Sequence, residues 1–218
     1  MSVITVERKV LQKNDEVAAQ NRELFKKHHL VTLNLLSSPG SGKTTLLERT
    51  LEKLQGKLRV GVVEGDVQTD RDAQRIAKYG GPVVQIVTNG ACHLEATLIR
   101  DAVNQLPLEE MEVLIIENVG NLVCPASYDL GEDMKVVLVS TTEGDDKPLK
   151  YPKMFRVADV CVITKIDLLP HVEFDVVALR NHALQINPNL TFFETSAKTG
   201  EGVDAWVEWI VGVKRESR

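Results

Sequence analysis

The sequence predicts a doubly wound α/β domain, in which a mainly parallel seven-stranded sheet carries helices on both faces. Short apolar runs recur along the chain with helix-like stretches between them, and the runs are apolar at successive positions. Strands that are apolar on both faces and joined by helical crossovers are typical of a covered parallel sheet. The expected strands are residues 31–36, 58–63, 83–87, 113–116, 136–139, 160–163 and 190–193.

A charged stretch with regularly spaced apolar residues precedes the first of these strands. Residues 13–28 place Val17, Leu24 and Phe25 at roughly helical spacing, which predicts an amphipathic helix lying on the sheet. We therefore expect a helical extension over residues 1–28 and a main domain over residues 29–218.

The composition indicates an ordinary globular domain. The chain has 218 residues, of which 43% are hydrophobic and 26% charged, with a net charge of -5. This balance lacks the basic excess typical of nucleic-acid binding, so we expect no nucleic-acid partner. We also expect no membrane partner and a cytoplasmic location, because the chain shows neither a long apolar run nor a signal-peptide pattern.

The first strand leads into the glycine-rich segment SSPGSGKT, residues 37–44, and then into a strong helix former. This strand-loop-helix order is typical of a phosphate-binding loop, in which backbone N–H groups cradle phosphate oxygens. Lys43 would reach the β and γ phosphates, and Thr44 would offer a hydroxyl to Mg²⁺. Ser37 stands where such loops usually begin with glycine. The residues expected to contact the nucleotide phosphates are Pro39, Gly40, Ser41, Gly42, Lys43, Thr44 and Thr45.

Acidic residues follow two other strands, at the edge where ligands of parallel sheets bind. Asp66 is the expected second Mg²⁺ residue, with Asp70 as its competitor. Glu117 ends a strongly apolar strand, and we expect it to position water and to neutralise charge during phosphate transfer. The N–H of Gly120, close behind it, would sense the γ-phosphate.

Two motifs near the end of the chain resemble the base-recognition motifs of GTPases. The first is Thr164-Lys165-Ile166-Asp167, in which the carboxylate of Asp167 would accept two hydrogen bonds from guanine. Thr164 replaces the usual asparagine, so we expect weaker or altered bracing of the loop. The second motif would meet the guanine oxygen with its backbone and comprises Ser196, Ala197 and Lys198. Together they predict a P-loop GTPase domain that binds GTP.

The three cysteines are unevenly placed. Cys92 and His93 are adjacent, and Cys124 lies a few residues after Glu117. A thiolate and imidazole set suits Zn²⁺ or Ni²⁺, although two of these thiols could equally be small apolar residues. Cys161 lies within an apolar strand and is expected to pack in the core.

In order, the segments SSPGSGKT, EGDVQTDRDA, NGACHLEA, IIENVGNLVCP, STTEGDDKPLKYP, TKIDLL and ETSAKTGEGVDAW resemble the hydrogenase nickel-incorporation GTPase family HypB, from about residue 28 onward. The resemblance implies a GTP-dependent homodimer that delivers nickel during maturation of nickel-iron hydrogenase. It also implies a nickel-delivery partner and a hydrogenase large-subunit precursor as partners. The family's interface metal site corresponds to Cys92, His93 and Cys124.

Other interpretations remain open. The urease accessory GTPase is similar, but its Cys-Pro-His element is divided here between Cys92-His93 and Cys124-Pro125. A small-molecule kinase would need an acceptor pocket, and a metal-binding module would turn nucleotide over only slowly. Lys147, in a polar segment after a strand, is a candidate for contacting the nucleotide across a dimer. Because no cysteine or histidine precedes residue 28, the expected metal locus is the interface site.

Overall fold

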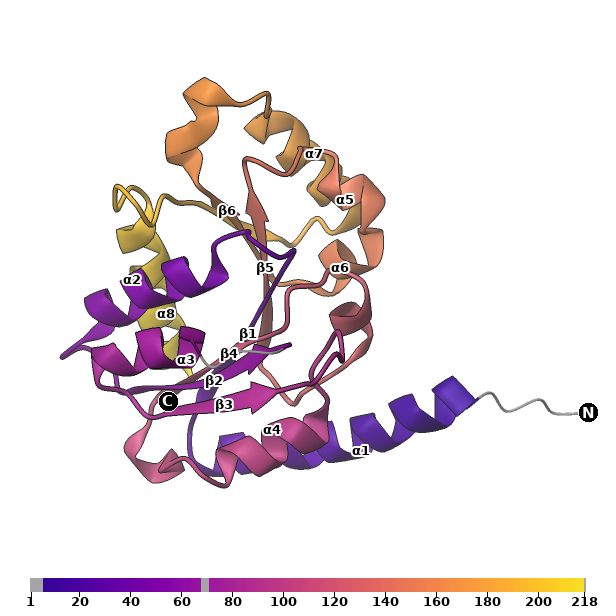
Figure 1. Cartoon of the computed structure of the whole chain (residues 1–218), viewed down its shortest axis with the longest axis vertical. Helices are drawn as coiled ribbons and strands as arrows, with labels where there is room; N and C mark the ends of the chain where they lie inside the picture. The colour runs from indigo at the N-terminus through magenta and orange to yellow at the C-terminus, as the bar shows by residue number, and fades with distance from the viewer. Residues whose placement is uncertain (1–5, 68–70, 218) are drawn as a thin grey trace, which may run out of the picture.

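A computed structural model of the chain describes residues 6–67 and 71–217 and confirms the predicted fold. Parallel strands form a seven-stranded sheet in the order β3-β2-β4-β1-β5-β6-β7 (Figure 1). Every expected strand is present, with bounds that differ from the prediction by at most three residues. The strands are β1 (Val31–Ser37), β2 (Val60–Asp66), β3 (Val83–Val87), β4 (Val113–Glu117), β5 (Met134–Ser140), β6 (Val160–Thr164) and β7 (Thr191–Glu194).

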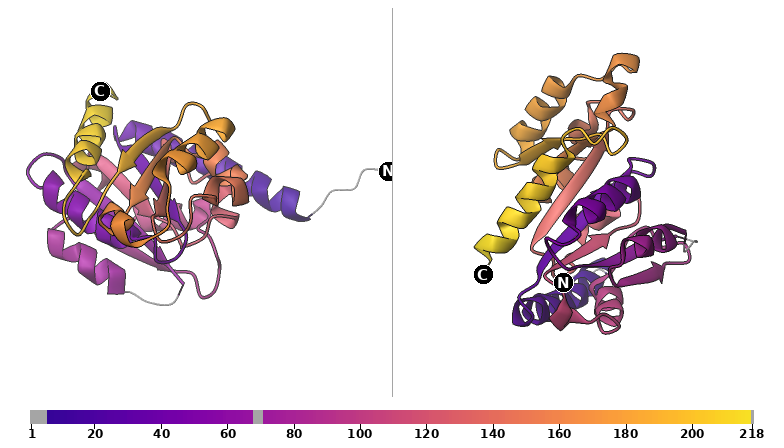
Figure 2. Two further views of the ribbon diagram at one scale, coloured as in Figure 1. Left: turned by 90° about the horizontal axis from the view of Figure 1, so that it is seen from above. Right: turned by 90° about the vertical axis from the view of Figure 1, so that its left-hand side faces the viewer.

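Helices connect the strands and cover both faces of the sheet (Figure 2). The α-helices are α1 (Val6–Lys27), α2 (Lys43–Leu54), α3 (Arg71–Ile76), α4 (Ala96–Val103), α5 (Lys147–Lys150), α6 (Pro152–Val157), α7 (Val176–Ile186) and α8 (Val203–Glu216). Short 3-10 turns are η1 (Ala77–Tyr79), η2 (Leu108–Glu110), η3 (Cys124–Ser127) and η4 (Ile166–His171).

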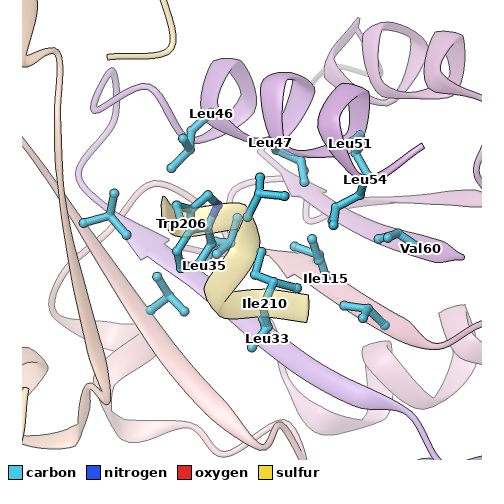
Figure 3. Packing of buried hydrophobic residues seen from close by; sticks show 14 of the residues in the cluster. Leu33, Leu35, Leu46, Leu47, Leu51, Leu54, Val60, Ile115, Trp206 and Ile210 are labelled. Carbon is cyan, nitrogen blue, oxygen red and sulfur yellow. The ribbon is translucent and has the colours of Figure 1, made fainter. Parts of the chain in front are cut away.

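Successive residues of the central strands point into different hydrophobic clusters, which is why the strands are apolar throughout. In β4, Ile115 packs with helices α2 and α8, whereas Ile116 faces the opposite cluster with α1 and α4. Figure 3 shows the first of these clusters, where Trp206 of α8 lies between α2 and the sheet. Residues of a single strand therefore pack against helices on both faces of the sheet.

Helix α1 packs along α4, beside the part of the sheet that contains β3 (Figure 1). It begins at Val6, earlier than the predicted residue 13, and buries Ala18 and Phe25. Phe25 belongs to a core cluster with residues of β2 and β4. The N-terminal helix therefore shares a hydrophobic core with the domain that follows it.

The carboxyl ends of all the parallel strands lie at one edge of the sheet, and the predicted site residues follow these ends. Within the described residues, no helix combines the length and the apolar character needed to cross a membrane.

Candidate functional site

The phosphate-binding loop joins the end of β1 to the start of α2. Gly40 and Gly42 adopt positive φ values of 76° and 91°, a backbone region that residues with a side chain rarely enter. Ser37 occupies the last position of β1, where its hydroxyl accepts a hydrogen bond from Lys43 Nζ at 3.0 Å. Serine is thus tolerated in place of the usual glycine because this position is extended strand.

Thr44 meets two acidic side chains at the first turn of α2. Its Oγ1 lies 2.8 Å from Glu117 Oε1 and 3.2 Å from Asp72 Oδ2. Among the described residues, the second oxygen of Glu117 is buried without a hydrogen-bond partner. A hydroxyl and carboxylates converging around an unsatisfied oxygen are the hard ligands that Mg²⁺ prefers, so these residues fit that ion.

Asp72 is an acidic residue that the sequence analysis missed. The predicted residue Asp66 lines the same cavity, and its carboxylate clusters with those of Glu64 and Asp72. The competitor Asp70 lies outside the described residues. Several acidic residues follow β2 in the sequence, so the sequence did not single out Asp72. In the structure, its position in the first turn of helix α3 directs its carboxylate toward Thr44.

Burial raises the pKa of two carboxyl groups in this cavity. Loss of solvent and, to a smaller extent, the neighbouring Glu117 together raise the pKa of Glu64 to about 8. Burial likewise raises the pKa of Glu117 to about 7, although Lys43 and Thr44 act in the opposite direction. Glu64 and Glu117 are register partners on adjacent strands, which explains their mutual repulsion.

The loop after β4 rests directly on the phosphate-binding loop. A Cβ atom placed on Gly120 would lie 3.0 Å from both the N and Cα atoms of Pro39, so a side chain at this position would press the two loops apart. Both loops line a cavity of about 510 Å³, together with Lys43, Thr44 and Glu117. The predicted phosphate-sensing position thus adjoins the phosphate loop.

A second cavity of about 290 Å³ lies beside the first and is lined by the two predicted base-recognition motifs. Asp167 Oδ1 accepts a hydrogen bond from Ser196 Oγ at 2.6 Å, so the motifs contact each other. Ala197 and Lys198 line this second cavity, and Gly42, Thr45 and Lys165 line both cavities. The predicted phosphate site and the predicted base site therefore adjoin each other.

Thr164 and Lys165 brace the phosphate-binding loop. Thr164 Oγ1 donates a hydrogen bond to Ser41 O at 2.6 Å, and Lys165 Nζ donates to Gly40 O at 2.7 Å. Thr164, which stands where asparagine is usual, thus makes a bracing hydrogen bond to the phosphate-binding loop. The shorter threonine reaches the loop because β6 ends directly beside it.

The structure places Lys147 against the phosphate loop of its own chain. Its Nζ donates to Ser38 Oγ at 2.9 Å and forms an ion pair with Glu143 at 3.0 Å. Glu143 also accepts a hydrogen bond from Ser41 Oγ. Glu143 lies four residues before Lys147, in the turn that precedes α5, and this ion pair holds the Lys147 side chain beside the phosphate loop.

The predicted metal ligands Cys92, His93 and Cys124 come together at the surface. The two Sγ atoms are 3.0 Å apart, Cys92 Sγ lies 3.6 Å from His93 Nδ1, and candidate ligand atoms of all three lie within 4.8 Å of one another. Two thiols and an imidazole form a donor set suited to Ni²⁺ or Zn²⁺. Cys161 is fully buried in β6, as expected.

The surroundings of His93 orient its ring. The Nε2 atom lies 3.7 Å from Glu95 Oε1, and the ring stacks on Tyr128 with centroids 3.9 Å apart. Burial lowers the pKa of His93, which favours the neutral form that binds metals. The hydrogen bond with Cys124 raises the pKa of the Cys92 thiol, so a bound metal would have to displace that proton.

Comparison with known proteins identifies the family of this chain. Residues 31–194 match the family described as CobW/HypB/UreG, nucleotide-binding domain. The hydrogenase maturation factor HypB of Rhizobium leguminosarum bv. viciae is 50% identical over 208 residues, covering 95% of this chain and 70% of the relative.

Solved structures of two relatives share the fold. HypB from Helicobacter pylori, crystallised in complex with nickel, has a TM-score of 0.89 at 45% identity, covering 94% of this chain and 96% of the other. HypB from Archaeoglobus fulgidus has a TM-score of 0.87 at 39% identity, covering 93% and 99%. This chain therefore belongs to the HypB family of hydrogenase maturation factors, within the CobW/HypB/UreG nucleotide-binding proteins.

Proposed function

We propose that this chain is a GTP hydrolase that couples its nucleotide state to nickel insertion during hydrogenase maturation. One observation carries the proposal: one continuous segment joins Glu117, at the end of β4 beside the phosphate cavity, to Cys124, in the metal cluster. Only six residues separate them in the sequence. A change in the phosphates would therefore be transmitted to the metal ligands over a short distance.

In the proposed hydrolysis, the chain positions and neutralises rather than forming covalent bonds with the phosphate. Lys43 and the backbone of the phosphate loop would hold the phosphates, and Thr44, Glu117 and either Asp66 or Asp72 would hold Mg²⁺. The ion would supply charge neutralisation at the transferred phosphate. Glu117 would position the attacking water, and Gly120 would contact the γ-phosphate.

Guanine is the base that the second cavity favours. Asp167 offers carboxylate oxygens as acceptors, which match the N1–H and the amino group of guanine. Adenine lacks that pair of donors, so the carboxylate would be left without partners at a cost of about 1 to 3 kcal/mol. The backbone at Ala197 and Lys198 would meet the guanine oxygen.

Nickel is the proposed cargo of the surface cluster. Three ligands from one chain leave a four-coordinate site incomplete, and a second copy in a symmetric dimer would supply the remainder. The crystallised nickel complex of the Helicobacter pylori relative supports nickel over zinc. Hydrogenase maturation then implies a nickel donor and a hydrogenase precursor as partners.

The hydrolysis is tested by measuring phosphate release from GTP and ATP with Mg²⁺ present. We expect release from GTP in preference to ATP, and Glu117→Gln should lower it by about 100-fold or more while GTP still binds. Glu109→Gln, at an exposed position, is the matched control. Equal rates for Glu117→Gln and the wild type would contradict the proposed role. Appearance of a phosphorylated small molecule would indicate a kinase.

The metal site is tested by nickel titration of the purified chain and of Cys92→Ala. Loss of one of three ligands should weaken binding by at least about tenfold, with GTP hydrolysis measured on the same samples. Cys161→Ala, which alters a buried thiol remote from the cluster, is the control for losing a cysteine. Unchanged nickel binding by Cys92→Ala would place the site elsewhere. Sedimentation with nickel and a non-hydrolysable GTP analogue tests the dimer.

A further inference from the structure

The metal cluster is assembled from two segments, and only one of them is continuous with the nucleotide-sensing loop. Cys124 follows Glu117 along the chain, whereas Cys92 and His93 follow β3, at the edge of the sheet. A nucleotide-dependent movement of residues 117–124 would reach Cys92 and His93 only through contacts between the segments.

Two asparagine side chains make such contacts, one on each side of His93. Asn121 Nδ2 donates a hydrogen bond to Cys92 O at 3.2 Å. Asn118 Oδ1 accepts a hydrogen bond from Leu94 N at 3.3 Å. Residues 92–94 are thus attached at both ends to the loop that begins at Glu117.

The same asparagines are fixed within their own loop. Asn118, which is buried, also accepts from Val119 N at 2.9 Å and lies directly after Glu117. Asn121 Oδ1 accepts from Val123 N at 2.8 Å, adjacent to Cys124. Each side chain therefore links the backbone of the sensing loop to the backbone of residues 92–94.

Leu94 adds a contact with the other acidic strand end. Its side chain lies 2.8 Å from the position that a Cβ atom on Gly65 would occupy, and Gly65 precedes Asp66. The residue after His93 consequently touches the neighbours of both Glu117 and Asp66. Residues 92–94 therefore contact the chain next to Asp66 and next to Glu117, two acidic residues that line the phosphate cavity.

The chain immediately beyond this segment is held by α1 instead. Asn14 Oδ1 accepts from Ala96 N at 2.8 Å, and Asn21 Nδ2 donates to Ala96 O at 2.8 Å. The start of α4 is therefore anchored on a helix that does not belong to the nucleotide site. Movement of the sensing loop would act on Cys92 and His93 relative to this anchor.

We propose that Asn118 and Asn121 are positioning residues that transmit the nucleotide state to Cys92 and His93, so that all three metal ligands respond together. This inference rests on the proposed function. It predicts that nickel affinity differs between the GDP-bound and GTP-bound chain, and that the difference depends on the asparagine contacts. The quantity to measure is the ratio of nickel dissociation constants in the two nucleotide states.

The test uses the full-length chain loaded with GDP or with a non-hydrolysable GTP analogue. We expect a ratio of about five or more for the wild type, in the usual range of coupling between sites. Asn121→Ala removes both contacts of that side chain, whereas Asn121→Asp keeps an acceptor for Val123 N and loses the donor to Cys92 O. Both variants should bring the ratio to within about twofold of one.

Asn187→Ala is the matched control, because it removes side-chain hydrogen bonds to the carbonyls of Phe155 and Ala158, away from both sites. It should keep the wild-type ratio. The nickel–thiolate charge-transfer absorption gives a second reading: it should change between nucleotide states in the wild type and the control, but not in the Asn121 variants.

Three results would overturn the inference: a wild-type ratio of one, a wild-type ratio retained in both Asn121 variants, or an equal loss of nickel affinity in both states. The last would mean that Asn121 only builds the site. Failure of the proposed function is detected separately, by the absence of GTP hydrolysis or by a nickel affinity that Cys92→Ala leaves unchanged.

Discussion

Glu64 shows how much of this site depends on single buried residues. It is 2% exposed, lies in register with Glu117 on the next strand, and accepts a hydrogen bond from Gln85. A carboxyl group in this position prefers its protonated form, because desolvation and repulsion from Glu117 both disfavour the ionised form. A cation bound nearby would reverse that preference.

The folded pKa of Glu64, about 8, lies above its ordinary value of 4.5, so its contribution to stability is complete below pH 4.5. That contribution is lost as the pH rises through about 8. We expect the melting temperature of the chain without nucleotide and Mg²⁺ to fall between pH 5 and pH 8.5. Glu64→Gln should flatten the decline, as measured by thermal unfolding across this range. An identical slope in the variant would contradict this account.

The sequence predicted single site residues well where a motif fixes their position and poorly elsewhere. Lys43, Thr44 and Glu117 were expected together and are found together, because the ends of β1 and β4 are adjacent. Asp72 and Glu64 were missed. No spacing rule distinguishes the acid that turns toward Thr44 from its neighbours after β2.

At the scale of elements, α1 forms hydrogen bonds and an ion pair with the segments that follow Cys92, His93 and Cys124. Asn21, fully buried, donates to the carbonyls of Ala96 and Leu130 and accepts from Arg100 Nε. Arg22 forms an ion pair with Asp129. These contacts tie the segments that follow both groups of metal ligands to one helix.

Asn21→Ala should therefore lower the free energy of unfolding by about 1 to 3 kcal/mol, because two buried carbonyls and the partly buried Nε of Arg100 lose their partner. Chemical denaturation measures the change. Gln20→Ala, at an exposed position of the same helix, should stay within about 0.5 kcal/mol of the wild type. Equal stability of Asn21→Ala and Gln20→Ala would show that α1 is not fastened by these bonds.

Helical spacing predicted the presence of α1 but not this role. Apolar periodicity identifies a buried face, and Phe25 lies in the core as that pattern requires. Asn14 and Asn21 read as ordinary polar positions in the sequence, and only their partners far along the chain reveal what they do. Polar contacts between distant segments cannot be recognised from the local sequence pattern around either residue.

At the scale of the whole molecule, the strand order explains why one loop can serve two sites. β1, which leads into the phosphate loop, lies between β4 and β5, so the loop after β4 passes beside the phosphate loop. The same loop then continues to Cys124, where it meets Cys92. The sequence predicted seven strands but not their order, since apolar runs do not specify neighbours.

The central claim is that the phosphate state of the nucleotide alters the metal cluster across this loop. Paired nickel titrations of the wild-type chain, loaded with GDP or with a non-hydrolysable GTP analogue, test it most directly. We predict nickel dissociation constants that differ by about fivefold or more between the two forms. Superimposable isotherms would contradict the claim and leave the nucleotide and metal sites as neighbours that act independently.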